Sequence, residues 1–147
     1  MLEIIPVSTM LFALIVGGGY AAVRGGPPER WGAALLFVSV VLSNVVAFAS
    51  QRHFVTPDMG LMAVDLIFLV GAVVIALRAQ RYWPMWVAAL QLDTMLTHLL
   101  KFSSFAPPFS YAFALWLWGL PVPLLLAAGA WRHRQRIKQW GSDPAWS

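Results

Sequence analysis

The stretch from Trp83 to Phe102 carries the side chains best suited to chemistry, because polar groups interrupt an otherwise apolar segment. On a helix with about 100° between successive residues, Asp93 and His98 lie about 140° apart, and every polar side chain falls within an arc of about 160°. A carboxylate and an imidazole on one face can take up and pass on a proton. The polar residues of this face are Gln91, Asp93, Thr94, Thr97, His98 and Lys101.

The opposite face of the same helix is entirely apolar, which suits contact with lipid or tight packing. The polar face must therefore meet protein or water, since ionisable groups inside a membrane are costly without a partner. This amphipathic helix is the element around which the predicted fold is organised.

The composition indicates a membrane protein. The chain of 147 residues is 60% hydrophobic and 11% charged, whereas a soluble domain contains about 25% charged residues. Apolar runs of about 20 residues recur between short basic or Pro/Gly-rich breaks, as in polytopic helical membrane proteins. Cysteine is absent, which excludes disulfides and thiolate ligands. The net charge of +4 resides at the ends of the runs and does not indicate nucleic-acid binding.

We predict an all-α membrane bundle of five transmembrane helices, followed by a basic cytoplasmic tail at 132–147. Residues 24–30 are expected to form a turn, and the prolines at 121 and 123 are expected to kink the last span. The small residues Ala13, Gly17 and Ala21 predict a packing face on the first span. Within residues 1–131 the expected spans are 4–23, 31–50, 61–77, 84–102 and 110–131.

The basic residues predict the orientation. With the N-terminus outside, eight Lys and Arg residues fall in cytoplasmic segments and two, Arg52 and Lys101, fall outside. This bias favours a multi-pass protein with an outside N-terminus and a cytoplasmic C-terminus. Trp31, Tyr82, Trp83, Trp86 and Trp131 then lie near the inner ends of spans, where we expect them to anchor the protein in the headgroup layer.

This topology predicts a shared polar layer. Asn44 and Asp65 fall in the outer half of their spans, as do Thr94, Thr97 and His98, with Asp93 beneath them near the midplane. Four interpretations remain open: interhelical hydrogen bonds that fix the bundle, a proton or ion path, a pocket for a quinone, lipid or small solute, and haem or metal ligation. No metal-ligand motif such as H-E-x-x-H is present, and we predict no metal and no cofactor.

The segment Arg81-Tyr82-Trp83-Pro84-Met85-Trp86, with Gln91 and Leu96-Thr97-His98-Leu99 after it, resembles a group of small bacterial inner-membrane proteins without an assigned activity. The resemblance covers about a third of the chain. It implies an inner-membrane location and no functional residues.

We expect a non-enzymatic protein that acts as a subunit or accessory factor of a larger membrane complex. Its partners would be the lipid bilayer and other membrane subunits or further copies of the chain. The alternative is a proton- or small-solute-handling protein that uses the polar face of the fourth span. A second alternative is an intramembrane redox or cofactor-binding protein.

Overall fold

The computed structural model describes residues 4–50, 59–102, 108–144 and 146, and the regular secondary structure of these ranges is helical. The predicted all-α class is confirmed. An isolated antiparallel bridge joins Ala79 to Trp146. The elements are α1 (Ile4–Ala13), the π-helical turn η1 (Leu14–Gly18), α2 (Gly19–Arg24), α3 (Pro27–Ser50), α4 (Met59–Arg78), α5 (Trp83–Phe102), α6 (Pro108–Gly119) and α7 (Pro121–Trp140).

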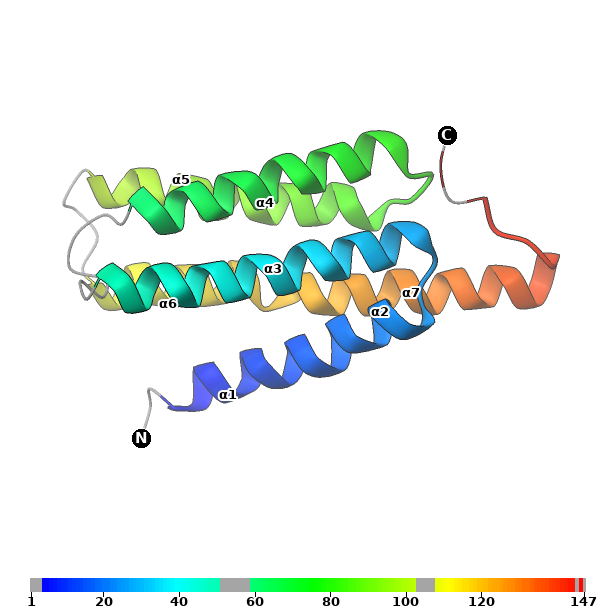
Figure 1. Cartoon of the computed structure of the whole chain (residues 1–147), viewed down its shortest axis with the longest axis horizontal. Coiled ribbons are helices and arrows are strands. Elements are labelled where there is room, and N and C mark those ends of the chain that lie inside the picture. The colour runs from blue at the N-terminus through cyan, green and yellow to red at the C-terminus, as the bar shows by residue number, and fades with distance from the viewer. Residues whose placement is uncertain (1–3, 51–58, 103–107, 145, 147) are drawn as a thin grey trace.

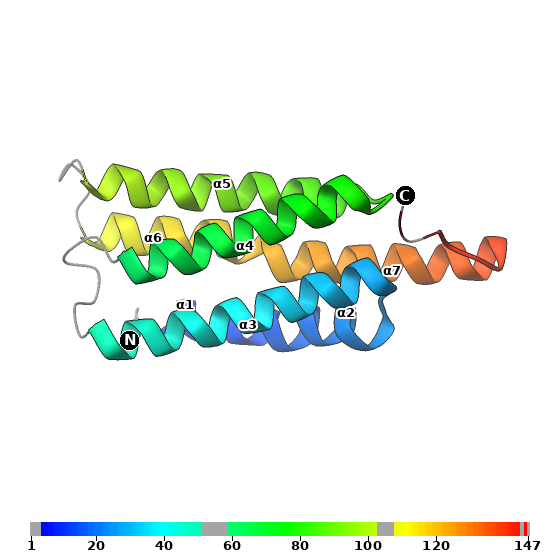
Figure 2. The same cartoon turned by 45° about the horizontal axis from the view of Figure 1, so that its top comes forward.

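The helices lie roughly side by side along one axis (Figure 1). The turns between α2 and α3 and between α4 and α5 lie at the same end of the bundle, which we call the tail end. There α7 extends past its neighbours, and the chain that follows it returns towards the α4–α5 turn in a second view as well (Figure 2). The α4 N-terminus, the α5 C-terminus and the α6 N-terminus lie at the other end, which we call the loop end.

Within the described residues, three helical stretches are long and apolar enough to cross a membrane, namely Pro27–Ala49, Met59–Arg78 and Phe113–Trp140. The stretch Ser8–Arg24 is apolar but shorter. Helix α5 has the same 20-residue length as α4, but Asp93, Lys101 and its other polar residues make it less apolar. Length and composition therefore indicate membrane association, while α5 depends on its neighbours to cover its polar face.

The first half of the chain differs from the prediction at a turn. Helix α3 begins at Pro27, so the expected turn at 24–30 is wrong in its second half. Proline suits the first helical turn because its missing N–H has no partner to lose there, and the acidic Glu29 in that turn is favoured by the helix dipole. The early start places Glu29 inside the tail end of the bundle.

The predicted packing face on the first span is confirmed, since Ala13, Gly17 and Ala21 are all buried. At Gly17 the π-helical turn approaches α7 so closely that an added Cβ would lie 2.5 Å from the Pro123 carbonyl oxygen. Only glycine fits this backbone-to-backbone contact.

The last predicted span is interrupted where we expected a kink, between α6 and α7 at Leu120. Pro121 and Pro123 lack the N–H groups that would continue the helical hydrogen bonds. Helix α7 then continues to Trp140, so much of the segment expected as a tail is helical. Gly141, with a φ of 72°, ends the helix and reverses the chain.

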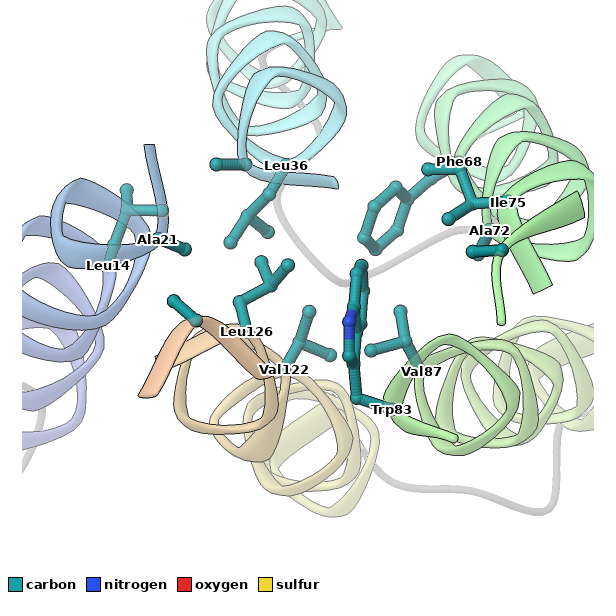
Figure 3. Close-up of a cluster of buried hydrophobic side chains, with 13 residues drawn as sticks. Leu14, Ala21, Leu36, Phe68, Ala72, Ile75, Trp83, Val87, Val122 and Leu126 are labelled. Carbon is teal, nitrogen blue, oxygen red and sulfur yellow. The ribbon is translucent and has the colours of Figure 1, made fainter. Parts of the chain in front are cut away.

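A buried hydrophobic cluster joins the helices around Trp83, whose indole lies among Phe68, Val87 and Val122 (Figure 3). The expectation that Trp83 anchors the protein in the headgroup layer is wrong, because its side chain is buried. Trp31, Tyr82, Trp86 and Trp131 are exposed, as lipid anchors would be. The indole N–H of Trp83 instead reaches a polar group inside the protein.

Candidate functional site

Helices α4, α5 and α6 bring an aspartate, a histidine and a tyrosine into one hydrogen-bonded chain near the loop end. His98 Nε2 lies 2.7 Å from Asp65 Oδ2, and His98 Nδ1 lies 2.7 Å from the Tyr111 hydroxyl. Both nitrogens of the imidazole are therefore engaged, one on each side. Asp65, His98 and Tyr111, together with Gln91, form what we call the Asp65 cluster.

Gln91 and Lys101 support this chain from α5. Gln91 Nε2 donates hydrogen bonds to Asp65 Oδ1 at 3.0 Å and to the Asp65 backbone oxygen at 3.2 Å. Gln91 and His98 are seven residues apart, which places both on the face of α5 that meets α4. Lys101 Nζ lies 5.4 Å from the centre of the Tyr111 ring, within the range of a cation–π contact.

The two ends of the hydrogen-bonded chain of side chains differ in their exposure to solvent. The side chain of His98 is 3% exposed and Tyr111 is buried, whereas 24% of the Asp65 side chain is exposed. The cluster is thus closed around the imidazole and the phenol and open at the carboxylate.

This arrangement is suited to moving or holding a proton. With one proton on Nε2, His98 donates to the Asp65 carboxylate and accepts from the Tyr111 hydroxyl. When a second proton arrives on Nδ1, the imidazolium forms an ion pair with Asp65 and donates to the tyrosine oxygen instead. Both states keep the same heavy-atom contacts, so protonation needs no rearrangement of the helices.

The structure brings together three of the predicted site residues, Asp65, Gln91 and His98. Thr94 and Thr97 are buried, but their hydroxyls donate to carbonyl oxygens of their own helix, at Leu90 and Asp93. Asp93 is half-buried. Thr94 and Thr97 therefore do not contribute their hydroxyls to the predicted polar layer. A threonine hydroxyl in a helix readily bonds to the carbonyl oxygen four residues before it.

Asn44 does not join the site, contrary to the prediction. It is exposed on α3 and donates from Nδ2 to the Val40 backbone oxygen at 2.7 Å. The predicted depth was not sufficient to place it in the site, because its side chain is exposed and bonds to its own helix. Tyr111 was missed, although an aromatic hydroxyl at the start of the last span was a visible signal for a partner of His98.

A second polar cluster lies at the tail end and was not predicted. The Trp83 indole N–H donates to Glu29 Oε1 at 2.9 Å, and Arg81 Nε lies 3.4 Å from the same oxygen. Arg81 Nη2 also donates to Asp143 Oδ2 at 2.6 Å. The side chains of Glu29, Arg81 and Asp143 are 0%, 4% and 2% exposed.

Two further donors from α7 complete what we call the Asp143 cluster, which comprises Glu29, Arg81, His133, Arg136 and Asp143. His133 Nδ1 lies 2.5 Å from Asp143 Oδ2, and Arg136 Nε donates to Oδ1 at 2.8 Å. Burial raises the pKa of the Asp143 carboxyl, but the hydrogen bonds from His133 and Arg136 and the charges of Arg81 and Arg136 outweigh it. The net result is a pKa below the ordinary value.

The known proteins offer no match that would assign either cluster a role. No family model, no curated protein and no solved structure matches the chain. Among the described residues, no group of three or more His, Asp or Glu side chains is arranged to hold a metal ion. The function is therefore argued from the geometry of the two clusters.

Proposed function

We propose that the protein is a multi-pass membrane protein that takes up or passes protons through the Asp65 cluster. The observation that carries the proposal is the continuous chain from the Asp65 carboxylate through both nitrogens of His98 to the Tyr111 hydroxyl. Ionisable residues at membrane depth are costly, and chains of Asp and His are a recurring feature of proton relays.

The partly exposed Asp65 carboxylate supports a point at which a proton would enter the cluster. Asp65 is the partly exposed member, and it lies seven residues into α4, about 9 Å from the start of that helix. A proton from the loop end would first meet this carboxylate and then the imidazole behind it. The buried Tyr111 hydroxyl lies on the far side of the imidazole.

The proposal includes five membrane-spanning segments, with the N-terminus outside and the C-terminus in the cytoplasm of a bacterium. The shorter apolar stretch Ser8–Arg24 and the polar helix α5 would then cross together with the three long apolar stretches. Most of the basic residues belong to segments at the tail end, which would make it cytoplasmic. The Asp65 cluster would open towards the outside.

The test is proton flux into liposomes that contain the purified protein, driven by a pH gradient and read with an internal pH dye. We expect Asp65→Asn to reduce the flux at least tenfold, because an amide cannot carry the proton. Asp93→Asn is the matched control, since it makes the same change on α5 outside the hydrogen-bonded chain. Equal flux through wild type and Asp65→Asn would refute the proposal.

A role as an accessory subunit of a larger membrane complex is the second candidate. The observation that favours it is the lack of bulk outside the helices, since short segments join the helices of the described chain. Purification in mild detergent, followed by mass spectrometry, separates the two candidates. A stoichiometric set of other membrane subunits would support the accessory role, and a protein that is isolated alone and carries flux would exclude it.

A further inference from the structure

The cations of the Asp143 cluster are arranged as a receptor for an oxyanion. Two guanidinium groups and an imidazole from two different parts of the chain converge on one carboxylate, with contacts of 2.5 to 2.8 Å. Arginine is the preferred residue for such sites because its planar fork matches the oxygens of carboxylates and phosphates. The receptor consists of Arg81, His133 and Arg136.

The Asp143 carboxylate leaves part of this receptor unused. Arg136 Nη2 is buried and has no hydrogen-bond partner among the described residues, although the neighbouring Nε is engaged. Arg81 Nε is likewise buried outside hydrogen-bonding geometry, 3.4 Å from Glu29. A carboxylate offers two oxygens, whereas a phosphate group offers at least one more strong acceptor. The receptor therefore has capacity for a larger anion than the one it holds.

The occupant is part of a short segment that follows α7. Gly141 turns the chain back, and Ser142 and Pro144 on either side of Asp143 are exposed. Beyond them the Ala79–Trp146 bridge holds the segment to the α4–α5 turn. The buried carboxylate is thus the main polar anchor of the segment.

We infer that Arg81, His133 and Arg136 form a phosphate-binding site, which Asp143 occupies from within the chain and from which a phosphate group displaces it. The charges fit an anion of one or two charges. Once Asp143 has left, the positive charges of Arg81 and Arg136 outnumber the single negative charge of Glu29, which contacts Arg81, and His133 would add a further positive charge when protonated. The phosphate could come from an anionic phospholipid headgroup at the membrane surface or from free phosphate.

The displacement predicts a specific effect of removing the carboxylate charge. Because a tethered group competes at a high effective concentration, we expect Asp143→Asn to tighten phosphate binding about tenfold. Arg136→Gln in the same background should abolish the gain. Arg132→Gln is the matched control, because it removes an exposed arginine of the same helix that lies outside the cluster.

Two probes distinguish the sources. Inorganic phosphate is titrated calorimetrically into the detergent-purified full chain, and phosphatidic acid adducts are counted by native mass spectrometry against phosphatidylcholine. Tighter binding of both probes supports a general phosphate site, and a gain for phosphatidic acid alone supports a lipid headgroup site. No gain with either probe, or a gain that survives Arg136→Gln, overturns the inference.

The wild-type chain provides a test that does not depend on the folding of variants. Saturating phosphate or phosphatidic acid should increase hydrogen–deuterium exchange in the peptide that contains Asp143, because the segment is released. Unchanged exchange under saturation by both probes would overturn the inference.

Discussion

The two polar clusters hold similar side chains but differ in how their charges are balanced. The Asp65 cluster joins two ionisable groups and a phenol in a line, with one partly exposed end. The Asp143 cluster joins two carboxylates to two arginines and a histidine, and its two carboxylates are almost completely buried. A line of exchangeable protons can transmit charge, whereas a compact network of opposite charges holds segments together. The comparison teaches that the first cluster is suited to proton transfer, whereas the second, with Asp143 in place, fastens the tail end of the bundle.

Breaking the Asp143 cluster should have the largest effect on stability. Glu29→Ala removes one of the two carboxylate partners of Arg81 and the acceptor of the Trp83 indole, and the excess of buried positive charge that remains costs about 3–5 kcal/mol. Unfolding in mixed micelles measures the change. Glu29→Gln, which keeps an acceptor for the indole, should lose less. A loss below about 1 kcal/mol in Glu29→Ala would show that the cluster does not fasten the bundle.

Adding a Cβ atom next to the same cluster should have the next largest effect on stability. A Cβ at Gly26 would lie 2.7 Å from His133 Cε1 and 2.9 Å from its Nδ1, so Gly26→Ala must displace the imidazole from Asp143. Overpacking of this kind costs about 1–3 kcal/mol. Gly19→Ala is the control, since a Cβ there meets nothing within 4 Å and should stabilise α2 by about 0.5–1 kcal/mol. Equal midpoints for the two variants in thermal unfolding would contradict this packing.

The segment that follows α7 should detach from the bundle only at low pH, where the Asp143 carboxylate is protonated. The pKa of Asp143 is lower in the folded protein than the unfolded value of about 3.9, so its contribution to stability is complete above that value. The contribution is lost as the pH falls towards the folded pKa. Thermal midpoints of wild type and Asp143→Asn should therefore differ by a constant amount at neutral pH and converge below about pH 4. A difference that already disappears near pH 6 would mean that another group controls the attachment.

The smallest effect is expected at Asn44, which was predicted to share the layer of the Asp65 cluster but does not share its contacts. Asn44→Ala removes a hydrogen bond within one exposed helical turn and should change the free energy of unfolding by less than about 0.5 kcal/mol. Proton flux should stay at the wild-type level. Reduced flux would show that α3 contributes to the site after all.

The sequence predicted the Asp65 cluster much better than the Asp143 cluster, and the reason is periodicity. Gln91 and His98 share one face of a single helix, and the depth of Asp65 follows from counting residues along a span. The Asp143 cluster has no such regularity, because Glu29, Arg81 and Asp143 belong to a helix start, a turn and a segment after the last helix. Long-range contacts between such segments leave no local pattern.

The same limit applies to the helix boundaries and to Trp83. The apolar runs indicated the main helical stretches of the described residues, but the early start of α3 at Pro27 and the extension of α7 to Trp140 depend on partners distant in sequence. Trp83 has the residue type and position of a lipid anchor. The Glu29 acceptor, fifty-four residues earlier, satisfies the indole N–H and so allows the ring to be buried in the hydrophobic cluster.

The most direct test of the account removes a single oxygen atom from the Asp65 cluster. Tyr111→Phe keeps the ring that packs against His98 and Lys101 but ends the hydrogen-bonded chain at the imidazole. Loss of this bond should change the free energy of unfolding by only about 1 kcal/mol. If the hydrogen-bonded side chains carry protons, the proton flux into liposomes should fall about tenfold or more in Tyr111→Phe, while the helix content is retained. Wild-type flux in Tyr111→Phe would contradict the account and leave the cluster as interhelical packing.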